Sequence, residues 1–501
     1  MACSKRVKRS HEVLRIQLND EPATIDWHRA TDIPSRTLIL TTMATLVDYN
    51  YDGVQPKLKP GLAESWEPQE RGKRWIFRLR KGITWSDGQV LTASQFVDSF
   101  ERLLKPKTGS FNASYFYSIR GAKEYNEGKN EDFSKVGVKA LDERTLEFRL
   151  QSSLSYFPKL MALFNTAPFR KDFLTVHGEF KNLTEIASLG PYRWVKYLPG
   201  EKIELEKNPN YFGGSPDISK LEFRFIKEPS TAVNLFKSGD IDILTKLPES
   251  QLPDLQKLRS YLQVEELSIE YLGFNFRTPP FDQRALRRSL RDAVNVSQLI
   301  RLLGGGISKN PIFVPVGLVS QKSATKIAES SVKGEVKKFK ISNPLKLSFP
   351  SESRQRRIAE FLQNQWKTKL GLEVELEPQD WKVFLGRVNS NPPMLYRLGW
   401  VAIFPDPYMF LSLWTSDSHY NTSGWSSKKY DETVLKLASE LNETKRQSYT
   451  EEALKILNEE VVVIPLYRGS RQYLVQDWVK NFTPNSLNRP QFQSVRWSTS
   501  N

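Results

Sequence analysis

Between residues 75 and 80, apolar side chains alternate with basic ones, and this period of two predicts a strand with one buried face. Further along, Thr92 and Gln95 stand three apart, which is the spacing of a helix capping box. Apolar residues then recur at helical spacing over residues 96–104 and stop before Pro106. The pattern predicts an amphipathic helix that follows a half-buried strand.

The same alternation of strand and helix returns along the chain. One unit is predicted as a helix over 358–370, a turn at Gly371 and a strand over 372–377. A second is predicted as a strand at 221–225 followed by a helix over 231–237. A third is predicted as a strand at 271–276 followed by helical spacing over 284–303. The Ser- and Lys-rich segment 317–343 predicts a long surface loop. Together these elements indicate the α/β class.

The length of 501 residues exceeds what one ordinary core serves, so we expect two to four lobes. No run of about 20 apolar residues occurs, and even the apolar stretch 461–464 is stopped by Pro465, so no membrane-spanning helix is predicted. The formal charge is +16, but basic residues are spread along the chain and form no recognisable nucleic-acid module. We interpret the charge as a solvated basic surface and expect no nucleic-acid partner.

The N-terminus has no hydrophobic segment and is not a complete secretory signal. Its Cys3 is the only cysteine of the chain, so an intramolecular disulfide is impossible. The pair Ala2-Cys3 resembles the end of a bacterial lipobox, in which the cysteine is lipidated. The alternative is a free thiol in a frayed terminus.

No catalytic or metal-binding pattern is found in the sequence. The four histidines are scattered without metal-ligand spacing: His11, His28, His177 and His419. The glycines at 304–306 lack the lysine and the following serine or threonine of a phosphate loop. We therefore expect a protein that is not an enzyme and has no metal or cofactor, in which these histidines lie on the surface or serve packing.

Six blocks of the chain carry a family resemblance. They are residues 61–67 with 75–88, residues 190–192 with 208–212, residues 237–242, Asn275 with 280–281 and 286–287, residues 399–400 with 406–407, and residues 463–467. In content and order they resemble the signatures of the peptide/nickel family of bacterial extracellular solute-binding proteins, family 5.

The resemblance implies a hinged, two-lobed periplasmic binding protein of type II with an extra N-terminal subdomain. Lobe I would comprise residues 1–50, 183–270 and 470–501, the subdomain residues 51–182, and lobe II residues 271–469. Such receptors exchange between open and closed forms, and ligand shifts the population toward the closed form. An ATP-driven importer's permease would recognise that form.

The block at 399–407 departs from the family pattern at one position. Peptide-binding members have an aspartate there that pairs with the free α-amine of the peptide, whereas this chain has Ile403. Because an unpaired buried ammonium costs several kcal/mol by order of magnitude, we expect a penalty on free amino termini unless another acid substitutes. Asp406 is the nearest substitute, although an Asp-Pro step also serves as a turn or helix start.

Three further residues are candidates for ligand contact. Arg397 stands where some oligopeptide receptors place an arginine for the ligand carboxylate, and the alternative is an ion pair at a strand edge. Trp400 would offer an apolar plane to the ligand, or else belong to the core. Asn275, in the block that opens the second lobe, completes the set.

Three functions stay open from the sequence. The first is a receptor for peptides or peptide-like compounds, with free strand-edge backbone groups as its mark. The second is a receptor for oligosaccharide or another uncharged solute, marked by stacked aromatics, and the third is a ligand-sensing interaction protein without import. We expect a monomer in the periplasm or cell envelope, attached to the membrane only through lipidated Cys3.

Overall fold

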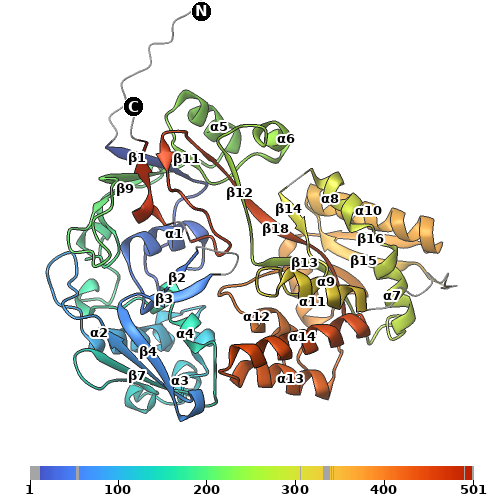
Figure 1. The fold of residues 1–501 in the computed structure, drawn as a ribbon, viewed down its shortest axis with the longest axis horizontal. Helices are drawn as coiled ribbons and strands as arrows, with labels where there is room; N and C mark the ends of the chain where they lie inside the picture. Colours follow the sequence, from blue (N-terminus) through green and yellow to red (C-terminus); the bar gives the residue numbers. More distant parts are fainter. Residues whose placement is uncertain are drawn as a thin grey trace, which may run out of the picture. The chain divides into compact units, whose positions relative to one another are not determined.

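The computed structural model describes residues 12–51, 56–304, 306–330, 339, 341, 343–489 and 491–498. The chain forms two compact units (Figure 1). Unit 1 comprises residues 1–51, 57–264 and 471–501, and unit 2 comprises residues 52–56 and 265–470. The expected three-part division into two lobes and an extra subdomain stays a prediction.

The main sheet of unit 1 is built around β1 (Val13–Leu18), which is parallel to β10 on one side and to β11 on the other. Leu14, Ile16 and Leu18 are buried, as expected for a strand whose neighbours lie on both sides. Beyond β10 the order continues antiparallel through β9 and β8. The strands are β8 (Tyr192–Leu198), β9 (Lys202–Lys207), β10 (Lys220–Phe225) and β11 (Ile243–Leu244).

A second, antiparallel sheet of unit 1 has the order β4-β5-β7-β6. The predicted strand at 75–80 is β5, and the predicted helix that follows it is α2, so both predictions are confirmed. In the capping box, the Gln95 side chain accepts a hydrogen bond from the backbone N–H of Thr92 at 3.4 Å. The elements are β4 (Ala63–Gln69), β5 (Arg74–Leu79), α2 (Ala93–Leu104), β6 (Val138–Ala140) and β7 (Thr145–Arg149).

Unit 2 is built on a sheet of order β16-β15-β17-β13-β18, in which β14 also pairs with β18. β15 is parallel to both β16 and β17, whereas β13 is antiparallel to β17 and to β18. The strands are β13 (Ser268–Phe274), β14 (Ile307–Lys309), β15 (Leu345–Pro350), β16 (Val374–Gln379), β17 (Leu395–Val401) and β18 (Val463–Val475).

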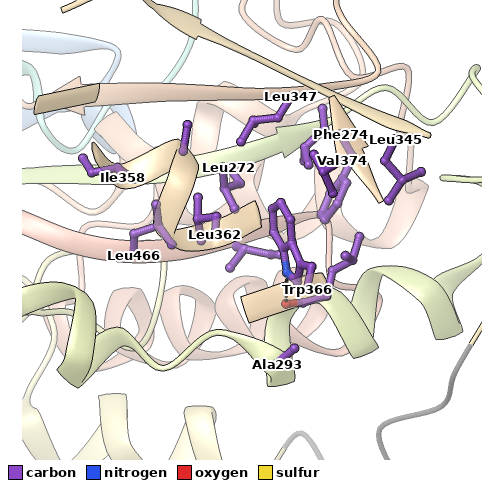
Figure 2. Packing of buried hydrophobic residues seen from close by; sticks show 14 of the residues in the cluster. Leu272, Phe274, Ala293, Leu345, Leu347, Ile358, Leu362, Trp366, Val374 and Leu466 are labelled. Atoms are coloured by element: carbon purple, nitrogen blue, oxygen red, sulfur yellow. Dashed lines mark hydrogen bonds between the residues drawn. The ribbon is translucent and has the colours of Figure 1, made fainter. Parts of the chain in front are cut away.

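Helix α10 (Ser353–Leu370) covers one face of this sheet with Trp366, which has no exposed surface. Figure 2 shows the indole among side chains of the strands and of α7 (Arg284–Ala293), and its Nε1 donates to the carbonyl of Leu290 at 3.0 Å. Gly371 ends α10 with a positive φ of 69°, which a residue without Cβ adopts at little cost. The predicted order of helix, turn and strand is confirmed by α10 and β16.

Two sequence predictions are corrected by the structure. The helical spacing over 284–303 belongs to two helices, α7 and α8 (Val296–Leu303), because Val294 is extended and Asn295 caps α8 by accepting from the N–H of Gln298. The predicted loop at 317–343 contains α9 (Gln321–Ser330), which buries Ala324 and Ile327.

The remaining elements complete the two units. They are α1 (Ile33–Thr42), β2 (Val47–Asn50), β3 (Lys57–Pro60), α3 (Ala122–Asn126), α4 (Phe157–Leu160), α5 (Pro229–Ser238), α6 (Leu252–Leu255), β12 (Tyr261–Glu265), α11 (Trp381–Ser390), α12 (Tyr408–Leu411), α13 (Lys428–Ser439), α14 (Glu443–Glu460), β19 (Val479–Lys480) and β20 (Arg496–Trp497).

Candidate functional site

The C-terminal half of β17 has an unpaired edge in unit 2. On one side β17 pairs with β13 along its whole length, from Leu395 to Val401. On the other side its pairing with β15 involves only Leu395 and Tyr396. Within the described part of the chain, the rest of this edge has no strand partner, so its backbone groups are available to an added strand.

The register shows which backbone groups point to that edge. Asn275 donates its N–H to the carbonyl of Met394, and Ala402 donates to that of Leu267, so even-numbered residues of this segment form the hydrogen-bonded pairs with β13. The N–H and C=O groups of Gly399 and Val401 therefore point away from β13. Val401 is 56% exposed, so this end of the strand is open to a ligand.

Trp400 and Tyr420 form an aromatic surface beside this edge. Their ring centroids lie 4.9 Å apart with the planes at 69°, and the ring of His419 is tilted by 40° against that of Tyr420, with the centroids 3.9 Å apart. Tyr420 is 49% exposed and Trp400 is half-buried, with its Nε1 buried and without a hydrogen-bond partner among the described residues. The indole N–H is thus an unused donor next to the free edge.

Ile403 follows this surface and is half-buried, whereas its neighbours Ala402 and Phe404 are buried. An aliphatic side chain offers neither charge nor hydrogen bond to a ligand. Of the five candidates from the sequence, Trp400 and Ile403 are the ones that the structure leaves partly accessible.

Arg397 lies instead in a buried ion pair. Its Nη2 donates to Glu270 and, at 2.9 Å, to the hydroxyl of Tyr467. A Cβ at Gly399 would lie 2.5 Å from Oε1 of Glu270, so the glycine gives this carboxylate the space to reach Arg397. Burial raises the pKa of Glu270, and the charge of Arg397 opposes that rise without cancelling it. This arrangement corresponds to the ion pair that the sequence analysis gave as the alternative to ligand contact by Arg397.

Asp406 is fully buried and bound to Arg446 of α14. Both of its oxygens accept from Nη2 of Arg446, at 2.8 and 2.7 Å, and Oδ1 also accepts the backbone N–H of Tyr408 at 2.9 Å. The carboxylate therefore fixes the start of α12 onto α14. As a substitute anchor for a ligand amine it has no exposed surface to offer.

Asn275 also has internal partners. Its Nδ2 donates to the carbonyl of Pro392 at 2.9 Å, and its Oδ1 accepts the N–H of Arg277 at 3.1 Å. The side chain shapes the turn after β13 and is buried.

The described histidines are surface or packing residues. His177 and His419 are exposed, whereas His28 is buried between Ser99 at 2.9 Å and Arg102 at 2.8 Å. Burial and the charge of Arg102 lower the pKa of His28 to about 3, so the ring is neutral near pH 7. His11 and Cys3, and with it the expected lipid anchor, lie outside the described residues.

No three His, Cys, Asp or Glu side chains of the described residues come together as a metal site. No helix in this part of the chain is long and apolar enough to cross a bilayer.

The residues that contact the predicted candidates carry no signal in the sequence. Tyr420, Glu270 and Arg446 are separated in sequence from the residues that they contact, and no local motif marks them. A spatial signal, such as co-variation of contacting pairs, is what finds such residues.

The chain is similar to known extracellular and periplasmic binding proteins. The family description "Bacterial extracellular solute-binding proteins, family 5 Middle" matches residues 57–422. The probable deoxycholate-binding periplasmic protein YgiS of Escherichia coli K12 is 30% identical over 96% of this chain and 92% of its own length. The periplasmic oligopeptide-binding protein OppA of the same strain is 28% identical over 92% and 88%.

Among solved structures, the unliganded open form of the periplasmic murein tripeptide binding protein MppA superposes with a TM-score of 0.85 at 26% identity, covering 97% of both chains. The fold and the order of elements are therefore shared with this protein along almost the whole chain.

Proposed function

The chain belongs to the bacterial extracellular solute-binding proteins of family 5, and on that premise we propose that it is the substrate-binding receptor of an ATP-driven importer, with peptides or peptide-like compounds as ligands. The names of relatives support this, since OppA is an oligopeptide-binding and MppA a murein tripeptide binding protein. Relatives named as periplasmic support a location in the periplasm or cell envelope. A permease partner, a monomeric state and a lipid anchor at Cys3 belong to the same proposal.

The observation that carries the proposal is the free edge of β17. Gly399 and Val401 each present an N–H and a C=O on that edge, in the alternation that an extended peptide matches. A ligand strand held there would place its side chains alternately on both sides of the sheet. The half-buried ring of Trp400 then contacts a ligand side chain, while the backbone bonds supply affinity that does not depend on ligand sequence.

The second part of the proposal concerns the end of the ligand. Ile403 stands where an acid would hold the α-amine, and Asp406 is already bound by Arg446. We infer that the preferred ligand has a blocked amine or none. The 30% identity to a protein named for deoxycholate, which carries no amine, agrees with this inference.

A second candidate function is a receptor for an uncharged or amphipathic solute that is not a peptide. Trp400 and Tyr420 favour it, because two adjoining rings stack well on the apolar face of a sugar or a fused-ring compound. The indole N–H of Trp400 and the hydroxyl of Tyr420 would then bind the ligand in place of the backbone groups of β17.

Replacement of Val401 by proline tests strand addition directly. The change removes an N–H that β13 does not use, so the fold loses no ladder hydrogen bond. We expect N-acetyl-trialanine to bind about three- to tenfold more weakly, the value of one hydrogen bond of about 0.5–1.5 kcal/mol. Isothermal titration calorimetry measures the change, with a thermal melt to verify folding.

Val401→Ala is the matched control, because it shortens the side chain and keeps the N–H. Equal affinities of the proline and alanine variants would contradict strand addition at this edge. If the unaltered protein bound no N-acetyl peptide at all, the non-peptide candidate would take precedence.

A further inference from the structure

Unit 1 contains a cavity of about 360 Å³. All residues that line it belong to unit 1, whereas β17 belongs to unit 2. It is enclosed by the end of α1, the β2–β3 hairpin, the loop at 211–213 and the C-terminal segment 489–493. Its volume is within the range of small-molecule sites.

The cavity has a buried guanidinium in its wall. Arg489 is 9% exposed, and its nearest carboxylate is Asp48, with Nη2 and Oδ1 4.0 Å apart, beyond hydrogen-bond distance. Tyr49 lies under the guanidinium, with the ring centroid 5.4 Å from Cζ. Asp48 is also shared with Lys59, whose Nζ lies 3.3 Å from its Oδ2.

The donors of Arg489 exceed its protein partners. A guanidinium has five N–H donors, and within the described residues the hydroxyl of Tyr51 is its hydrogen-bonding neighbour, whereas no carboxylate or carbonyl oxygen accepts from it at hydrogen-bond distance. Buried arginine side chains are ordinarily paired, because leaving a charge without hydrogen bonds is costly. The backbone of Arg489 is held in place, since its N–H and C=O both bond the side chain of Asn485. The backbone that carries this side chain is thus fixed, and the guanidinium has more donors than the hydroxyl of Tyr51 can accept from.

The rest of the wall adds positive charge and apolar surface. Arg80 uses its Nε for the carbonyl of Gly61 at 2.7 Å and lies over the ring of Phe212 at 5.5 Å. Among the described residues that line the cavity, three are cations, Lys59, Arg80 and Arg489, and one is a carboxylate, Asp48. Leu40, Met43 and Phe212 line the same space.

We propose that this cavity is a binding site for a small organic carboxylate, held by Arg489 and Arg80 and covered on its apolar part by Leu40, Met43 and Phe212. Guanidinium groups match a carboxylate through paired N–H donors, and the apolar wall distinguishes an organic acid from an inorganic anion. The site is independent of the ligand proposed for β17.

Benzoate, neutral benzamide and inorganic phosphate are suitable probes for the full-length protein, with binding measured by calorimetry at low chloride. We expect benzoate to bind at least tenfold more tightly than benzamide, and Arg489→Gln to weaken benzoate about 10- to 100-fold, as the loss of a charged hydrogen-bonding partner predicts. Arg193→Gln is the matched control, because Arg193 pairs with Glu206 on β8 and β9 and does not line the cavity.

Equal binding of benzoate and benzamide would overturn the proposal, and so would unchanged benzoate affinity in Arg489→Gln. Binding of phosphate in preference to benzoate would overturn the organic class. If Arg489→Gln fails to fold, Arg80→Gln decides, because Arg80 is only half-buried and lines the same cavity. The Val401→Pro variant is expected to bind benzoate normally, which separates this site from the one at β17.

Discussion

Replacement of Ile403 by aspartate is expected to convert the protein into a receptor for peptides with free amino termini. A carboxylate at this position, beside the free edge of β17, supplies the partner that a ligand ammonium lacks. Charged hydrogen bonds contribute about 1.5–3 kcal/mol, so the affinity for trialanine should rise about 10- to 150-fold. N-acetyl-trialanine should bind more weakly than to the unaltered protein, because the new carboxylate is desolvated without a partner.

Calorimetry with the two peptides measures both effects. Ile403→Asn is the matched control, since it has nearly the same shape as aspartate without the charge, and it should raise the affinity for trialanine far less. If the unaltered protein already prefers trialanine to its acetylated form, the claim that Ile403 disfavours a free amino terminus is wrong. So would an aspartate variant that leaves the preference unchanged.

Asp406→Asn is expected to lower the free energy of unfolding by about 3–5 kcal/mol, the cost of leaving one member of a buried ion pair alone. The side chain of Asp406 has no exposed surface and that of Arg446 is 6% exposed, so solvent cannot replace the missing charge. Urea unfolding followed by tryptophan fluorescence measures the change.

Glu443→Gln is the control, because Glu443 approaches the same Arg446 at 3.7 Å but is 90% exposed. Exposed pairs contribute little, so this variant should stay within about 1 kcal/mol of the unaltered protein. The double replacement of Asp406 by Leu and Arg446 by Met should recover part of the loss, since it removes both charges. A stable Asp406→Asn variant would show that Asp406 is not the structural anchor described above.

The elements that could be predicted are those marked by alternation, capping residues or apolar spacing within a short stretch of sequence. The strand β5, the cap and apolar face of α2, and the order of α10, Gly371 and β16 follow from spacing alone. The break between α7 and α8 was missed because apolar spacing continues across it, while the cap at Asn295 depends on one side chain. The helix α9 was missed because, among its described side chains, only Ala324 and Ile327 are buried in an otherwise polar segment.

The family could be predicted from the sequence, whereas the ligand-binding role of the site residues stays a prediction. The family predicted from the six sequence blocks is confirmed by the match over residues 57–422. Trp400 and Ile403 could be placed because they belong to one contiguous block. The partners of Arg397 and Asp406 could not, since Glu270 lies 127 positions and Arg446 40 positions away in sequence. The cavity around Arg489 is likewise assembled from distant segments and leaves no pattern in the chain.

The central claim is that this receptor does not anchor a free α-amine. Native mass spectrometry of protein purified without denaturation, with identification of the small molecules released from it, tests the claim most directly. We predict ligands without a free α-amine, such as N-blocked peptides or amine-free compounds. A released set of short peptides with free amino termini would contradict the claim, because it would mean that the position of Ile403 does not decide which end groups bind.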